Sequence, residues 1–224
     1  MLFQQYSKVS RVVHASRPVH RVMAGLSALS MALALGLPGQ VQAQGAELAG
    51  VQYPATIKVE GVPLVLNGSG ISYRAVAKVY TVGLYISQKS DKPAVILGMN
   101  GPKQLRFVML QGMRIDELGR LITSGIEHNS NREEFYRMIP AIRVMGEQFA
   151  HIKRMSAGDT FSIEWVPARG SVFVVNGQPV GLPIADPGFF VAVLRVWLGN
   201  KPSSPGLKNA LLDYQAPPVL NALD

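Results

Sequence analysis

The sequence predicts an α+β fold with a large antiparallel sheet and helices layered on one face of it. Two observations support this prediction. Strand-like runs, helical runs, further strand-like runs and further helical runs follow one another in blocks, without the regular strand–helix alternation that is typical of a parallel sheet. Turn residues such as Gly61 and Asn100-Gly101-Pro102 separate the first strand-like runs, as expected for strands joined by tight connections.

The first 43 residues are expected to be an export signal that is not part of this fold. They carry four basic residues and no acidic one, and then an apolar run from Val22 to Leu37. That run is shorter than the ~20 residues that a membrane-spanning helix needs. Small residues at Val41 and Ala43 predict cleavage after Ala43 by a signal peptidase, which would place the protein in a bacterial periplasm. An uncleaved membrane anchor is the alternative.

The remaining chain, residues 44–224, has the length of one ordinary domain. We divide it into an N-terminal segment (44–54), a domain (55–213) and a loose tail (214–224) that contains two prolines. Loss of the four basic residues of the signal would lower the net charge from +8 to +4, and the basic residues are scattered, so no nucleic-acid partner is expected. Cysteine is absent, which excludes thiol nucleophiles, cysteine-bound metals and disulfides.

The first block of the domain is expected to be four strands, over residues 56–59, 62–66, 74–86 and 105–110. Each of these runs is rich in β-branched, aromatic or other apolar residues. Asn67-Gly68 is expected to form a turn between the second and third strands, because both residue types favour turns.

The middle block is expected to be helical. One helix is predicted from about Asp116 to Glu127, because its apolar residues recur at helical spacing. A second is predicted to start at Ser130, which together with Glu133 has the spacing of a capping box. Pro140 should kink or split this helix, since proline lacks a backbone N–H. The apolar face of this helix is either core or a wall facing a lipid ligand.

The last block returns to strands and ends in helices. Strands are expected over residues 160–166 and 171–175, and Asn176-Gly177 is a hairpin turn signal. A helix that carries Trp197 is predicted to dock on the sheet and to end at Gly199. A short helix over residues 207–212 should precede the tail.

Three stretches carry a resemblance to a known family. They are residues 68–85, which begin with a glycine-rich run and end in Gly-Leu-Tyr, residues 197–202 (Trp-Leu-Gly-Asn-Lys-Pro), and residues 207–212. These stretches resemble the exported bacterial branch of the chalcone isomerase-like family, and the resemblance covers about residues 56–212. It implies an open-faced sandwich of one large antiparallel sheet and a helix layer. The family includes chalcone-cyclising enzymes, fatty-acid-binding relatives and members without an assigned role, so the site residues have to decide the function.

The resemblance also implies where a site would lie. In the enzymes of the family, an arginine follows the glycine run and a threonine lies on the next strand. Here Ser72 holds the arginine position, and Arg74 lies two residues on, on the same side of a strand. Arg74 is therefore either a ligand contact or a solvent-facing side chain. Tyr80 holds the threonine position, where its phenol could donate a hydrogen bond.

The enzymes further use a tyrosine and an asparagine on the following helix. Near these positions this sequence has Ile115 and Ile122, which have no polar group, and Arg114 and Thr123 are the nearest polar substitutes. The resemblance therefore gives five candidate ligand-binding residues, which are Arg74, Tyr80, Ser72, Arg114 and Thr123.

These replacements favour an exported, non-catalytic protein that binds a small amphipathic ligand such as a fatty acid. An arginine beside an apolar cavity would hold the carboxylate or phosphate of that ligand. Two alternatives stay open: an isomerase that acts on a chalcone-like enone, and a periplasmic interaction or assembly protein without a ligand. No cofactor is expected, and no metal, because Glu147 and His151 at helical spacing are typical of a solvated pair.

Overall fold

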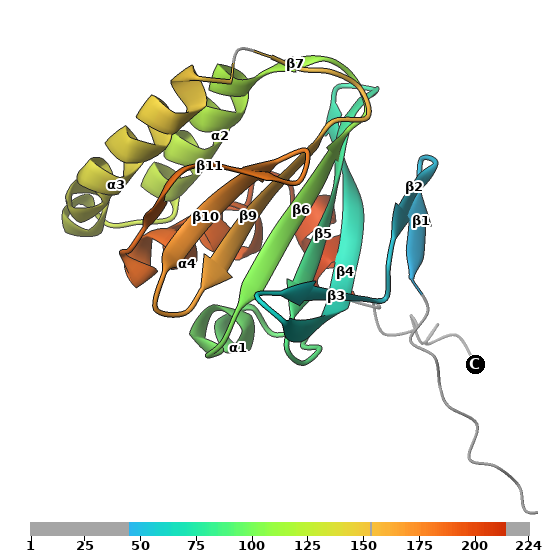
Figure 1. The fold of residues 1–224 in the computed structure, drawn as a ribbon, viewed down its shortest axis with the longest axis horizontal. Helices are drawn as coiled ribbons and strands as arrows, with labels where there is room; N and C mark the ends of the chain where they lie inside the picture. Colours follow the sequence, from blue (N-terminus) through green and yellow to red (C-terminus); the bar gives the residue numbers. More distant parts are fainter. Residues whose placement is uncertain (1–44, 153, 214–224) are drawn as a thin grey trace, which may run out of the picture. The chain divides into compact units, whose positions relative to one another are not determined.

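The computed structural model describes residues 45–152 and 154–213 (Figure 1). The predicted export signal and the predicted tail lie outside these residues. The main sheet has seven strands, in the spatial order β11 (Gln178–Ile184), β10 (Gly170–Val175), β9 (Thr160–Val166), β6 (Lys103–Met109), β5 (Ala77–Ile86), β4 (Val62–Arg74) and β3 (Thr56–Val59). Every neighbouring pair is antiparallel, which confirms the predicted α+β class.

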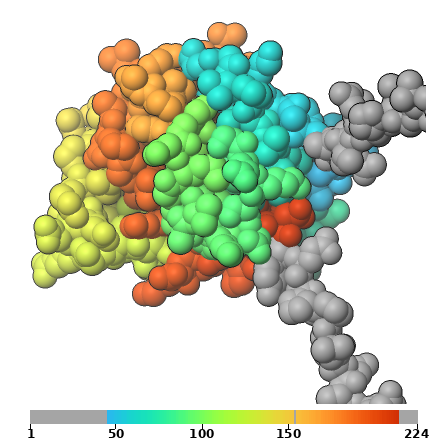
Figure 2. All heavy atoms as spheres, turned by 90° about the horizontal axis from the view of Figure 1, so that it is seen from below, coloured from blue at the N-terminus to red at the C-terminus, as the bar shows by residue number. Residues whose placement is uncertain are grey.

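The described residues form five helices, which are α1 (Pro93–Gly98), α2 (Ile115–His128), α3 (Arg132–Ala150), α4 (Pro187–Leu198) and α5 (Pro205–Leu211). Helix α4 packs on the sheet, and α2 packs on α4 and on α3. Figure 2 shows the α1 segment (green) next to the C-terminal helices (orange to red). No helix among the described residues has the length and apolar character needed to cross a membrane.

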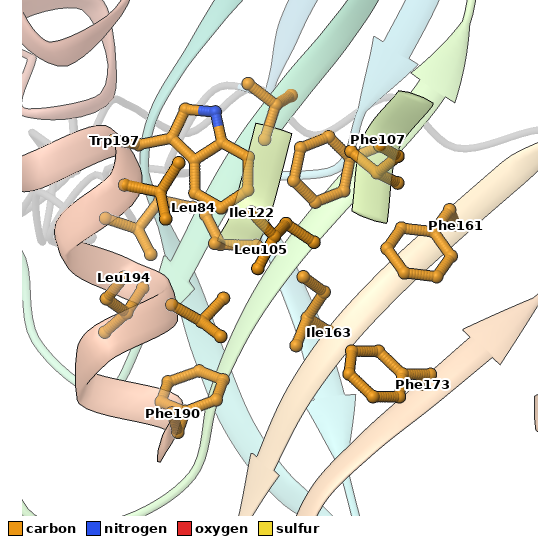
Figure 3. Close-up of a cluster of buried hydrophobic side chains, with 14 of the residues drawn as sticks. Leu84, Leu105, Phe107, Ile122, Phe161, Ile163, Phe173, Phe190, Leu194 and Trp197 are labelled. Atoms are coloured by element: carbon orange, nitrogen blue, oxygen red, sulfur yellow. The ribbon is translucent and has the colours of Figure 1, made fainter. Parts of the chain in front are cut away.

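The main core lies between the helices and the sheet. Figure 3 shows Trp197 and Leu194 of α4 pointing into side chains of β5, β6 and β9. The Trp197 and Phe107 rings have their centroids 5.2 Å apart, and both side chains are fully buried. Because Trp197 is completely enclosed, the prediction that this helix docks on the sheet through Trp197 is confirmed.

The glycine-led segment is a strand and not a turn. β4 spans Val62 to Arg74, with register shifts against β5 at Asn67 and after Ser72, and the chain reverses afterwards at Ala75, whose φ is 53°. The prediction of a turn at Asn67-Gly68 was therefore wrong. Asn67 uses its side chain to hold neighbouring segments, donating to the carbonyls of Ser90 and Leu211, and Gly68 lies beneath α5. The glycine is needed for close packing of backbone against backbone rather than for a positive φ.

A second face of the sheet is covered by a small hairpin of β1 (Ala46–Leu48) and β2 (Val51–Tyr53). The Tyr53 ring lies against Gly83, where a Cβ atom would be 2.6 Å from the ring. The Tyr53 hydroxyl donates to Thr81 Oγ1 at 2.8 Å, and the Tyr85 hydroxyl donates to the Pro54 carbonyl at 3.0 Å. Burial raises the pKa of Tyr53 to about 12. The Gly-Leu-Tyr motif therefore anchors this hairpin. The sequence patterns predicted neither the hairpin nor this role of the motif.

Three local predictions need adjustment. The capping box of α3 uses Asn131 with Glu134, one residue beyond the predicted pair. Helix α3 is not split, because it continues through Pro140. The predicted turn at Asn176-Gly177 is confirmed, with positive φ at both residues, but it leads into β11, a strand that was not predicted. β11 contains two prolines and lies at the edge of the sheet, where missing N–H donors are tolerated.

Candidate functional site

The position at which the family's enzymes have their site is closely packed in this chain. Ser72 and Tyr80 face each other across β4 and β5. The Tyr80 ring is fully buried, and its hydroxyl accepts a hydrogen bond from Trp197 Nε1 at 3.4 Å. Burial raises the pKa of Tyr80, and the hydroxyl of Ser72 and the indole of Trp197 oppose this shift. On the helix side, Ile115 and Ile122 are buried in the same core.

Arg74 is the last residue of β4 and reaches the first turn of α2. Its Nη2 donates to Glu117 Oε2 at 2.7 Å, in the first turn of α2. The Arg74 side chain is 68% exposed, and this contact holds the pKa of Glu117 below its usual range. Arg74 therefore forms a surface ion pair with the protein's own carboxylate rather than facing an apolar cavity.

A groove with a volume of about 880 Å³ lies between α2 and α3. These two helices run side by side at one end of the sheet (Figure 1). The apolar part of its lining comes from both helices and from the residues that follow α3, and consists of Ile115, Ile142, Met145, Phe149, Ala150 and Ile152. Met145 and Phe149 belong at the same time to the main core, so the floor of the groove is continuous with the core.

Two glycines give the groove its room. A Cβ atom at Gly119 of α2 would lie 3.3 Å from the Phe149 ring, so the ring rests on the helix backbone. A Cβ atom at Gly146 of α3 would have nothing within 4 Å, so this position faces open space. Glycine inside a helix costs about 0.5–1 kcal/mol relative to alanine. Both glycines line the groove, so this cost falls on the two helices that enclose it.

The groove has a basic end. Arg114, the N-cap of α2, donates to Asp116 Oδ1 at 2.9 Å, and Arg120 donates to Asp116 Oδ2 at 2.8 Å. These two hydrogen bonds lower the pKa of Asp116 to about 2, and the same contact raises the pKa of Arg114. Further along α2 the lining becomes neutral and then acidic, through Thr123 and Glu127. The groove thus offers arginines at one end and an apolar floor along its length.

The family model described as chalcone isomerase-like matches residues 45–213. The chain belongs to the chalcone isomerase-like family. Among solved structures, this chalcone isomerase-like protein is similar to a fatty-acid binding protein of Arabidopsis thaliana, with a TM-score of 0.61 and 13% sequence identity. The similarity covers 76% of this chain and 96% of the Arabidopsis chain. No curated protein sequence matches the chain.

The family comparison confirms membership of the chalcone isomerase-like family, and the structural similarity confirms the fold, whereas the exported bacterial branch stays a prediction. Of the five predicted site residues of this chalcone isomerase-like protein, Arg114 and Thr123 line the groove, whereas Arg74, Tyr80 and Ser72 lie outside it. Sequence reasoning did not single out Arg120. For the apolar face of α3, which includes the floor residues Met145 and Phe149, it left open core packing and a wall facing a lipid ligand, because apolar residues at helical spacing indicate core packing first. The signal that could have found the groove is a glycine inside each of two neighbouring amphipathic helices.

Proposed function

We propose that this protein binds a small amphipathic anion, such as a fatty acid, in the α2–α3 groove and catalyses no reaction there. The observation that carries the proposal is the combination of an apolar floor with an arginine end in one groove of about 880 Å³. From Ile115 to Glu127 the lining of α2 extends ~18 Å, at about 1.5 Å per residue. That length suits an acyl chain, with its carboxylate at Arg114 and Arg120.

The absence of catalysis is supported by the residues at the positions that the family's enzymes use. Ile115 and Ile122 can neither donate nor accept a hydrogen bond, and Tyr80 is enclosed in the core. Electrostatic catalysis requires polar groups directed at the reacting atoms from a water-excluding pocket. In this chain the polar groups near those positions, Arg114 and Thr123, face the open groove instead. The similarity to a protein named for fatty-acid binding agrees with this ligand class.

Export to the periplasm through a cleaved signal is part of the same proposal. Four basic residues, an apolar run and Val41-Gln42-Ala43 support it. Mass spectrometry of protein recovered from a periplasmic extract should give a chain that begins at Gln44. Recovery of the uncut chain from the membrane fraction would instead support the anchor alternative.

The groove can be tested by filling it. Gly146→Trp places a large ring where a Cβ atom meets nothing within 4 Å, so we expect it to fold and to lose dodecanoate binding at least tenfold. Glu147→Trp is the matched control, because Glu147 is the next residue of α3 and does not line the groove. Binding would be measured by isothermal titration calorimetry on the full chain. Equal affinity in both variants would place any binding site elsewhere and refute the proposal.

A further inference from the structure

The basic end of the groove contains an unfavourable charge pairing. β7 (Met113–Arg114) and β8 (Arg154–Met155) form a short antiparallel ladder, in which Arg114 lies directly opposite Arg154. Like charges in directly opposed positions destabilise a strand pair. Gly112 makes room for the second guanidinium, since a Cβ atom there would lie 2.5 Å from Arg154 Nη2. The ladder thus brings two arginines together at the groove that Arg114 lines.

The acidic residues of the protein neutralise this cluster only in part. Asp116 is shared between Arg114 and Arg120. Glu117, the next carboxylate along α2, pairs with Arg74. Within residues 45–152 and 154–213, no carboxylate forms an ion pair with Arg154. Arg114 and Arg120 line the groove, whereas Arg154 lies beside Arg114 with its guanidinium over Gly112. Together with Asp116, these three arginines leave an excess of two positive charges at and beside one end of an apolar groove.

From this charge excess we infer that the groove prefers an amphiphile with a phosphate monoester head group over a carboxylate of the same chain length. A carboxylate brings one negative charge, whereas a phosphate monoester brings about 1.5 to 2 at neutral pH, with three acceptor oxygens. Two guanidinium groups can each bind such a group through paired N–H donors. The inference rests on the proposed function, because it needs the chain of the ligand to occupy the apolar floor.

The test compares dodecyl phosphate, dodecanoate and inorganic phosphate by calorimetry on the full chain. We expect dodecyl phosphate to bind about tenfold more tightly than dodecanoate, which corresponds to ~1.4 kcal/mol. Arg154→Gln should reduce this preference to about twofold or less while leaving dodecanoate affinity within about twofold. Arg154→Lys, which keeps the charge and loses the paired donors, should give an intermediate preference. Arg143→Gln, an exposed arginine of α3 outside the groove lining, is the control and should change neither affinity.

Three results would overturn the inference. Equal or tighter binding of dodecanoate would remove the preference while leaving the proposed function intact. Inorganic phosphate that binds as tightly as dodecyl phosphate would mean that the arginines take a free anion and that the apolar floor contributes nothing. Failure of both amphiphiles to bind would refute the proposed function and the inference together.

Discussion

Replacing Gly68 by alanine should loosen α5 from the sheet. The new Cβ atom would lie 2.6 Å from the Leu211 carbonyl oxygen and closer still to that of Ala210, whereas ordinary contact begins at 3.4 Å. Both obstacles are backbone atoms, so no side-chain rotation relieves them, and α5 has to retreat by roughly 1 Å. Overpacking of this kind costs ~1–3 kcal/mol. The same retreat stretches the 2.8 Å hydrogen bond from Asn67 to Leu211, which contributes about 1 kcal/mol.

The expected total is a loss of ~3 kcal/mol in the free energy of unfolding, which lowers Tm by about 6–12 °C in a domain of this size. Urea denaturation followed by circular dichroism measures it. Gly98→Ala is the matched control, because a Cβ atom at Gly98 has nothing within 4 Å, and it should change stability by at most about 0.5 kcal/mol. If Gly68→Ala unfolds at the same urea concentration as Gly98→Ala, the close contact between β4 and α5 is not the reason for this glycine.

Three further predictions concern stability. Tyr53→Phe leaves the buried Thr81 hydroxyl without its donor and should lower the free energy of unfolding by about 1–3 kcal/mol. In a double-mutant cycle, Thr81→Val should destabilise the Tyr53→Phe variant much less than it destabilises the unchanged protein. Pro140→Ala restores a backbone donor at an exposed position inside α3 and should stabilise the protein by about 1–3 kcal/mol in urea denaturation; a loss would contradict this. Burial raises the pKa of Glu164, so the stability associated with its neutral form is present below the unfolded pKa of 4.5 and is lost as pH rises through the folded pKa. Glu164→Gln should therefore be more stable than the unchanged chain at pH 7 and equal to it near pH 3.5, and thermal unfolding at both pH values checks the sign.

The sequence predicts the fold more reliably than the site. Helices, strands and turns follow from local patterns of residues, whereas a groove forms between segments whose contact the sequence does not show. Helix α2 and the hairpin turn at Asn176-Gly177 follow from periodicity and turn chemistry, which are local properties. β11 was not predicted, because its two prolines are penalised in a central strand and tolerated only at an edge. The role proposed for Arg154 depends on the pairing of β8 with β7, and the sequence does not reveal that two-residue ladder.

The residues by which the family is recognised build the scaffold, and this separates recognition from function. Gly68 makes room for α5, Gly83 makes room for Tyr53, and Tyr85 anchors the chain at Pro54. A chain can keep all of these contacts and still change its ligand, because none of these residues lines the α2–α3 groove. Exposed lining residues such as Arg120 and Gly146 can be substituted at little cost in stability, whereas the floor residues Met145 and Phe149 belong to the core. Family membership therefore constrains the sheet of this protein tightly, whereas its ligand has to be inferred from the arginines and glycines of two helices.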